Sequence, residues 1–221
     1  AAAAAPPPPP RPWTRAVGPM VAKPAATVSF PSDDESTGQV TIAWRGAAHD
    51  DHATRLAFSL LWDYLSDAPT SPLQLALVEC DDPIASEVYA PGDVFRVGYE
   101  QLWFDGVDTE RLDEVEARFD AAIARVLADD LDLARLQTCV TRRRRRYLAA
   151  MDDAPADALV DRCIKHFLYE ERADPAAESA KLAARVDTLG LLSRLSAEPA
   201  SFWRALIETY LARPAPRATV L

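Results

Sequence analysis

The sequence from residue 38 to residue 46 is Gly-Gln-Val-Thr-Ile-Ala-Trp-Arg-Gly, in which large apolar side chains alternate with small or polar ones. Successive side chains of an extended segment point to opposite faces, so Val40, Ile42 and Trp44 share one face. A run with this period, rich in β-branched residues and ended by a glycine, is typical of a half-buried strand. We therefore predict a strand over residues 38–45.

The next segment has a different period. Its apolar residues follow an i, i+3, i+4, i+7 spacing, which predicts an amphipathic helix over residues 53–65 with one face packed on something flat. Arg55, Ser59 and Asp63 fall on the opposite side of this helix. The apolar set is Ala53, Leu56, Ala57, Leu60, Leu61, Tyr64 and Leu65.

The remaining segments complete a mixed layout. A short helix is expected from Ser71, because a proline stands in its first turn, where a missing N–H costs nothing. Strands are expected over residues 84–90 and 94–104, joined by a Pro-Gly-Asp turn, and residues 217–221 have a strand-like composition. Helical periodicity covers residues 112–127, 132–150, 156–170, 177–195 and 199–212. Together these elements predict an α+β domain of two layers, with a sheet on one side.

Composition excludes several classes of protein. The 221 residues include 24 Lys+Arg against 34 Asp+Glu, a formal net charge of −10, which argues against a general polyanion binder. No apolar run approaches the roughly 18 residues of a transmembrane helix. The three cysteines, Cys80, Cys139 and Cys163, are too few and scattered for a disulfide framework and favour a reducing compartment.

The N-terminal stretch differs from the rest. Five alanines and five prolines open the chain, and no acidic residue precedes Asp33. A proline run stays extended because it donates no backbone hydrogen bonds, so we predict a disordered leader or linker over residues 1–27 and a single domain over 28–221. An SH3-type ligand and a transit peptide are weaker alternatives. The alanine start and the strand-like finish at Leu221 suggest a truncated chain.

A run of five arginines, Arg142–Arg146, invites a nucleic-acid or localisation patch as one interpretation. Successive helical residues point about 100° apart, however, so the run forms no single basic stripe. The apolar stripe through Leu136, Val140 and Tyr147 also passes through Arg143. We expect Arg143 to be partly buried and paired with a carboxylate or carbonyl, on an otherwise solvated helix.

Two pairs of residues resemble incomplete metal sites. His49 with His52, and Cys163 with His166, each supply two ligands, whereas zinc needs at least three. We therefore expect cap or surface histidines and a core cysteine at position 163. The sequence contains no HExxH, HxxEH, glycine-rich phosphate loop or GxSxG motif. It predicts no catalytic and no metal-binding residues in this chain, and substrate-binding residues remain unknown.

Trp44 and Arg45 are the best candidates for a role beyond packing, as an interdomain or chamber-facing pair. The favoured alternative is a core tryptophan next to a paired arginine at the end of a strand.

Several segments resemble the pitrilysin/insulinase family of zinc metallopeptidases, in its divergent branch related to mitochondrial presequence protease. The resemblance extends over residues 28–221 and concerns the non-catalytic second domain. The segments that carry it are Phe30-Pro-Ser-Asp-Asp-Glu35, residues 38–46, Tyr64-Leu65, Ser71-Pro72-Leu73, Val78-Glu79, Asp82-Pro83, Arg142-Arg143 and Phe167-Leu168-Tyr169.

This resemblance implies a largely antiparallel sheet with several helices on one side, used as the wall of a chamber that closes around a peptide. Zinc is then expected only on the HxxEH helix of another domain, so this chain would degrade no peptide alone and its status as an enzyme stays open. The implied partners are catalytic and C-terminal peptidase domains, in cis or trans, and a peptide substrate, with no nucleic acid and no membrane. The implied compartment is cytoplasmic or mitochondrial. The alternative is a stand-alone interaction or scaffold module that binds a protein partner.

Overall fold

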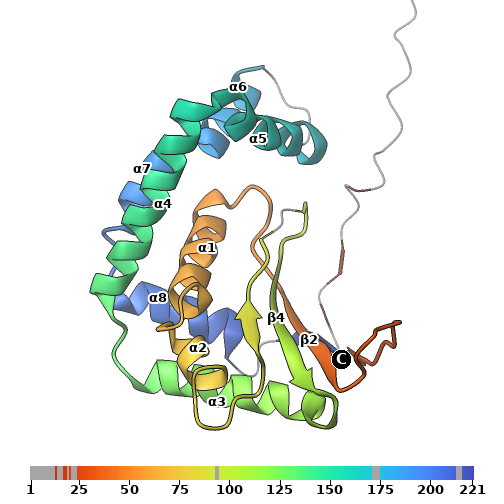
Figure 1. The fold of residues 1–221 in the computed structure, drawn as a ribbon. Coiled ribbons are helices and arrows are strands. Elements are labelled where there is room, and N and C mark those ends of the chain that lie inside the picture. Colours follow the sequence, from red (N-terminus) through yellow and green to blue (C-terminus); the bar gives the residue numbers. More distant parts are fainter. Residues whose placement is uncertain are drawn as a thin grey trace, which may run out of the picture.

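The structure, a computed structural model, describes residues 13, 17, 18, 20, 24–92, 95–170, 175–212 and 216–221. These residues form a five-stranded sheet with helices on one face and a helical arm that extends past one end of the sheet (Figure 1). The strands are β1 (Ala25–Ala26), β2 (Thr37–Arg45), β3 (Glu87–Tyr89), β4 (Tyr99–Asp108) and β5 (Arg217–Val220).

The sheet has the strand order β1-β5-β2-β4-β3. β2 pairs antiparallel with both β4 and β5, and β3 pairs antiparallel with β4, while the short β1 runs parallel to β5. The predicted fold class, a two-layer α+β domain with a largely antiparallel sheet, is confirmed.

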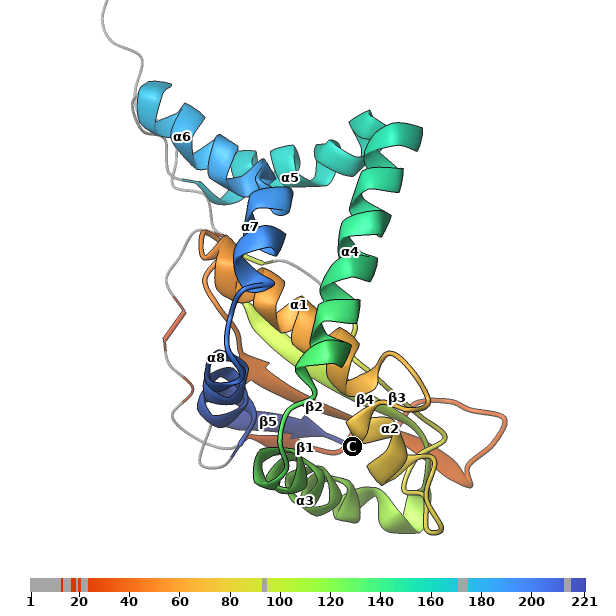
Figure 2. The ribbon, with the colours of Figure 1, turned by 90° about the vertical axis from the view of Figure 1, so that its left-hand side faces the viewer.

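The helices that cover the sheet pack on the apolar side of β2. Val40, Ile42 and Trp44 are buried there, as the alternating pattern predicts, and the Trp44 ring lies 5.4 Å from that of Phe119. Figure 2 shows α1, α3 and α8 in front of the sheet. The full set of helices in this layer is α1 (His52–Ser66), α2 (Pro72–Leu77), a 3-10 helix (Thr109–Glu114), α3 (Val115–Ala128), α8 (Ala200–Leu206) and a π-helical turn (Ile207–Leu211).

The helical arm consists of α4 (Leu133–Asp153), α5 (Pro155–Tyr169), α6 (Pro175–Val186) and α7 (Thr188–Leu195). The prediction of one continuous helix over 177–195 is wrong, because the chain breaks at Asp187. The Asp187 carboxylate accepts a hydrogen bond from the Gly190 N–H at 3.0 Å and so caps a new helix.

Helix α5 lies at the far end of the arm and packs against α4 and α6. None of its residues is buried, and Cys163 is exposed. The prediction of a core cysteine at this position is therefore wrong. The apolar stripe beside it is real, but Val160 and Ile164 are 49% and 50% exposed because this side of α5 has no neighbouring element among the described residues.

Two predicted boundaries also need correction. Ala25 and Ala26, assigned to a disordered leader over 1–27, pair with Thr219 and Val220 at the edge of the sheet. Most of the leader lies outside the described residues. β4 begins at Tyr99 rather than at residue 94 and continues to Asp108, four residues past the predicted end at 104.

Candidate functional site

One face of the sheet carries no helix in the described part of the chain (Figure 1). Tyr89, Trp103, Thr41 and Val220 lie in register and form a row across β3, β4, β2 and β5 on this face. We call the residues of this row, with Gln101 and Ala43 beside them, the open sheet face. Its side chains are half-buried or exposed, so it is an accessible surface in this chain.

Trp103 stands at the centre of the open sheet face. Its indole Nε1 is shielded from solvent and has no hydrogen-bond partner within the described residues, and its ring lies 5.7 Å from that of Tyr89. Burial, and then a hydrogen bond with Asp105, raise the pKa of Tyr89, so its hydroxyl keeps its proton. Aromatic side chains with a polar handle are common where a protein contacts another polypeptide.

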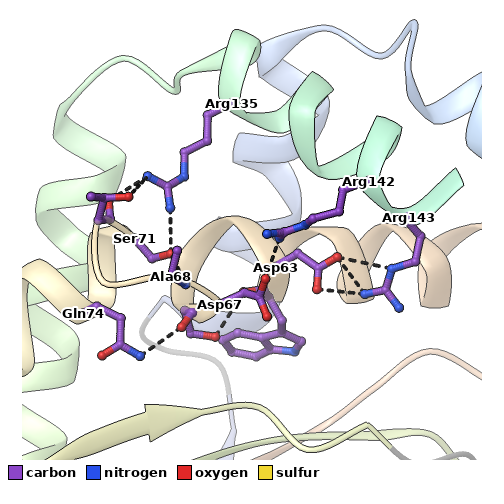
Figure 3. A network of polar contacts seen from close by, with 11 residues as sticks. Asp63, Asp67, Ala68, Ser71, Gln74, Arg135, Arg142 and Arg143 are labelled. Atoms are coloured by element: carbon purple, nitrogen blue, oxygen red, sulfur yellow. Dashed lines mark hydrogen bonds and ion pairs between the residues drawn. The ribbon is translucent and has the colours of Figure 1, made fainter. Parts of the chain in front are cut away.

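On the other side of the sheet, arginines of α4 hold the helical arm against α1 (Figure 3). Arg143 donates to both oxygens of Asp63, from Nη2 to Oδ1 at 2.8 Å and from Nε to Oδ2 at 3.2 Å. Arg142 pairs with Asp67 at 2.5 Å, at the end of α1. The prediction that Arg143 is partly buried and paired with a carboxylate is thus confirmed, while Arg144–Arg146 are exposed.

A cavity of about 500 Å³ lies between α1 and the arm. Arg55, Ser59 and Asp63 line it, and these residues occupy the side of α1 that faces away from the sheet. Arg162 and Lys165 of α5 line the opposite wall. We call this space the arm cavity.

Glu100 is the second residue of β4 and lines the arm cavity from the helix-covered side of the sheet. Its carboxylate accepts a hydrogen bond from Trp62 Nε1 at 2.8 Å. Burial raises the pKa of Glu100, and the Trp62 hydrogen bond and the charge of Arg55 offset only part of that effect. The protonated form of Glu100 is accordingly favoured more than in a free glutamic acid.

A group of charges around Glu170, which follows α5, joins the arm to the connection between β2 and α1. Arg185 donates to Glu170 at 2.9 Å, Lys181 lies 3.2 Å from its other oxygen, and His49 Nδ1 lies 3.5 Å away. Burial alone would raise the pKa of Glu170, but the hydrogen bonds from Arg185 and Lys181 outweigh it and lower the pKa. Burial lowers the pKa of His49.

A family model described as peptidase M16 inactive domain matches residues 4–142, more than half of the chain. This chain belongs to that family. The resemblance to the non-catalytic second domain of pitrilysin/insulinase-type peptidases is confirmed by this match.

Curated relatives of this inactive domain are longer proteins. An uncharacterized protein of Caenorhabditis elegans is 29% identical over 215 residues, and one of Schizosaccharomyces pombe is 32% identical over 148 residues. The alignments cover 96% and 66% of this chain, but only 21% and 14% of the relatives. The chain therefore spans about a fifth or less of these relatives.

Solved structures share the fold of the inactive domain. A protease from Helicobacter pylori gives a TM-score of 0.63 at 14% identity, over 89% of this chain and 42% of that one. An inactive peptidase domain from Bordetella parapertussis gives 0.61 at 14% identity, over 87% and 92%. The ferredoxin protease FusC, solved in complex with Arabidopsis ferredoxin, gives 0.51 at 14% identity, over 89% and 21%.

Two of the three histidines contact charged side chains of the arm. Arg185 Nη2 lies 3.3 Å from His49 Nδ1, so this ring nitrogen faces a cation. His166 Nε2 contacts Glu178 at 3.1 Å. Across the residues that the structure describes, no group of three or more His, Cys, Asp or Glu side chains could hold a metal ion. No helix among them is long and apolar enough to cross a membrane.

Trp44 and Arg45, the predicted candidates for a role beyond packing, are separated by the fold of the inactive domain. Trp44 is 2% exposed within the core, as the favoured alternative states. Arg45 is exposed on the other side of β2 and donates to the Gly18 carbonyl at 3.3 Å, without a carboxylate partner among the described residues. The partner of Arg45 is thus a backbone carbonyl, and because Trp44 and Arg45 lie on opposite sides of β2, the two side chains do not act as a pair.

Glu100 and Glu170 are buried or partly buried acids of this site that were not among the predicted candidates. A signal for Glu100 was available, because it occupies an inward position in an alternating strand, where a polar residue requires a partner. No local pattern marks Glu170, whose partners come from β2–α1 and α6.

Proposed function

We propose that this inactive domain is a non-catalytic wall of a zinc metallopeptidase-like protein that degrades peptides, with zinc and water activation supplied by another domain. The observation that supports this most is the open sheet face in a member of the inactive-domain family. A half-buried tryptophan ring beside Tyr89, at the centre of a sheet face that no described helix covers, suits contact with an extended peptide.

Exposed apolar side chains on the arm are evidence for the kind of partner that the family implies. Leu148, Val160 and Ile164 are 45%, 49% and 50% exposed on α4 and α5. Exposed apolar side chains grouped on neighbouring elements are typical of interaction surfaces. We infer that catalytic and C-terminal peptidase domains, in cis or trans, are the neighbours that cover them.

Peptide hydrolysis by the purified chain tests the proposal. The full 221-residue chain is incubated with Zn²⁺ and a mixture of fluorogenic peptides, with and without a chelator, beside a zinc peptidase as positive control. The expected result is no chelator-sensitive cleavage, since zinc catalysis needs protein ligands and a general base held together. Chelator-sensitive cleavage that C163S or H166Q abolishes would overturn the proposal.

A further inference from the structure

The arm cavity has an unusual charge for this chain. Five cationic side chains line it against three acidic ones, a surplus of two positive charges in a chain whose net charge is −10. The cations are Arg55, Arg143, Arg162, Lys165 and Arg185, and the acids are Asp63, Glu100 and Asp161.

Three of these cations have carboxylate partners. Arg143 pairs with Asp63 at 2.7 Å, and Lys165 pairs with Asp161 at 2.6 Å. Arg185 donates to Glu170, which lies behind the cavity wall. These pairs use up the charges of Asp63 and Asp161, the two cavity acids other than Glu100.

Arg55 and Arg162 form no ion pair within the described residues. A guanidinium has five N–H donors. Arg55 uses one of them on the His49 carbonyl at 3.4 Å, and Arg162 uses one on the Ala158 carbonyl at 3.1 Å. Arg162 also lies over the Tyr147 ring, 4.9 Å from its centroid, a contact that involves the ring face and not a hydrogen-bond acceptor. Both arginines therefore keep N–H donors available on opposite walls of one cavity.

Two further observations indicate that the cavity lacks negative charge. Burial, followed by the nearby charge of Arg185, lowers the pKa of Arg55, and the charges of Glu100, Asp161 and Asp51 offset only part of that effect. The Arg185 side chain is 4% exposed, and its Nε has no hydrogen-bond partner in the described part of the chain. A buried cation without full compensation is costly, and an anion in the cavity would remove that cost.

We propose that the arm cavity binds an oxyanion, the carboxylate or phosphate group of a small ligand, between Arg55 and Arg162. Guanidinium groups match both kinds of oxyanion with paired N–H donors. Leu56, Trp62 and Leu191 also line the cavity and give the ligand an apolar side to pack against. The site lies on the helix-covered side of the sheet, apart from the open sheet face, so it stands whether or not the chain is a peptidase wall.

Calorimetric titration of the full chain tests this site. Inorganic phosphate and succinate are the two probes, with NaCl added to keep the ionic strength constant. We expect saturable binding of at least one probe with a Kd of about 1 mM or tighter. A preference for phosphate or for succinate identifies the oxyanion that the site accepts.

The variants R55Q and R162Q should each weaken binding about tenfold or more, because each removes one charged donor pair. R144Q is the matched control, since Arg144 is exposed on α4 and does not line the arm cavity. The variants R55K and R162K keep the positive charge and should bind better than the glutamine variants. This recovery distinguishes loss of the charge from loss of folding. Equal affinity in R55Q, R162Q and R144Q, or no saturable binding of either probe, would overturn the proposal.

Discussion

Arg143 and Asp63 lie 80 residues apart in the sequence and face one another across α4 and α1, where the guanidinium donates to both carboxylate oxygens (Figure 3). The Asp63 side chain is 11% exposed and that of Arg143 30%. The contact joins the helical arm to the body of the domain and forms one wall of the arm cavity. Together with the Arg142–Asp67 pair, it gives two members of the arginine run a structural role, while Arg144–Arg146 are exposed.

Removal of this pair should destabilise the domain. Asp63→Asn leaves Arg143 without a charge partner in a partly buried position, and we expect a loss of about 1–3 kcal/mol in the free energy of unfolding. Urea denaturation measures it. Arg144→Gln, at an exposed neighbour, should stay within about 0.5 kcal/mol of the parent chain. Equal effects in the two variants would show that the pair does not hold the arm.

Trp44 and Arg45 should differ sharply in their effect on stability. Trp44→Ala removes a core ring that packs against Trp62 and Phe119, and should cost about 3–5 kcal/mol. Arg45→Ala changes an exposed side chain and should cost less than about 0.5 kcal/mol. Thermal unfolding compares them. A mild effect of Trp44→Ala would return Trp44 to the list of functional candidates.

The local patterns predict the core of this fold well. β2 and α1 follow from alternation and helical periodicity, because burial against a single flat layer imposes a regular spacing on the sequence. β5 follows only from its strand-like composition, since its buried residues are the polar Arg217 and Thr219. The break at Asp187 escapes this approach because α6 and α7 continue the same apolar spacing across it. The backbone of Asp187 leaves the helical region, with ψ at 55°, and its side chain caps the new helix at Gly190.

The cavity and its charges are harder to predict. Arg55, Ser59 and Asp63 form the polar side of α1, which a sequence alone assigns to solvent. The arm covers that side through α5, whose own apolar residues point outward. A periodic pattern shows which face of a helix is apolar, but not which element lies over its polar face, so the arm cavity could not be inferred before the arm was placed.

Stability should decrease as the pH falls below the ordinary histidine range. Burial lowers the pKa values of His49 and His52 from the ordinary 6.5. The unfolded chain then binds more protons than the folded chain as the pH falls through 6.5, and the free energy of unfolding drops. Glu170, with its lowered pKa, acts in the same direction below its ordinary 4.5. Glu100, whose pKa burial raises, acts in the opposite direction above 4.5 and is outnumbered by the two histidines.

Urea denaturation at several pH values between 8 and 5.5 checks this dependence. In the double variant H49Q/H52Q, the free energy of unfolding should change less between pH 8 and pH 5.5 than in the parent chain. The difference between variant and parent at pH 8, where imidazoles are neutral, reports packing alone. A parent profile that rises toward pH 5.5 would contradict the assignment.

The three thiols should react in an order set by their exposure. Cys163 is exposed, Cys80 is half-buried and Cys139 is buried, where burial raises the pKa of its thiol. A thiol-specific chromogenic reagent should therefore show a fast phase that Cys163→Ser removes and a slow phase that Cys139→Ser removes. A fast phase that survives Cys163→Ser would contradict the outward placement of this side of α5.

Peptide binding at the open sheet face is the decisive measurement for the proposed chamber-wall role. Fluorescence anisotropy of a labelled unstructured peptide is measured with the parent chain, with Trp103→Ala and Thr41→Arg on the open sheet face, and with Ser193→Arg on the exposed side of α7 as control. We expect saturable binding that both open-face variants weaken about tenfold or more and the control leaves unchanged. Binding that Ser193→Arg weakens as much as Thr41→Arg, or no binding by the folded parent chain, would contradict it.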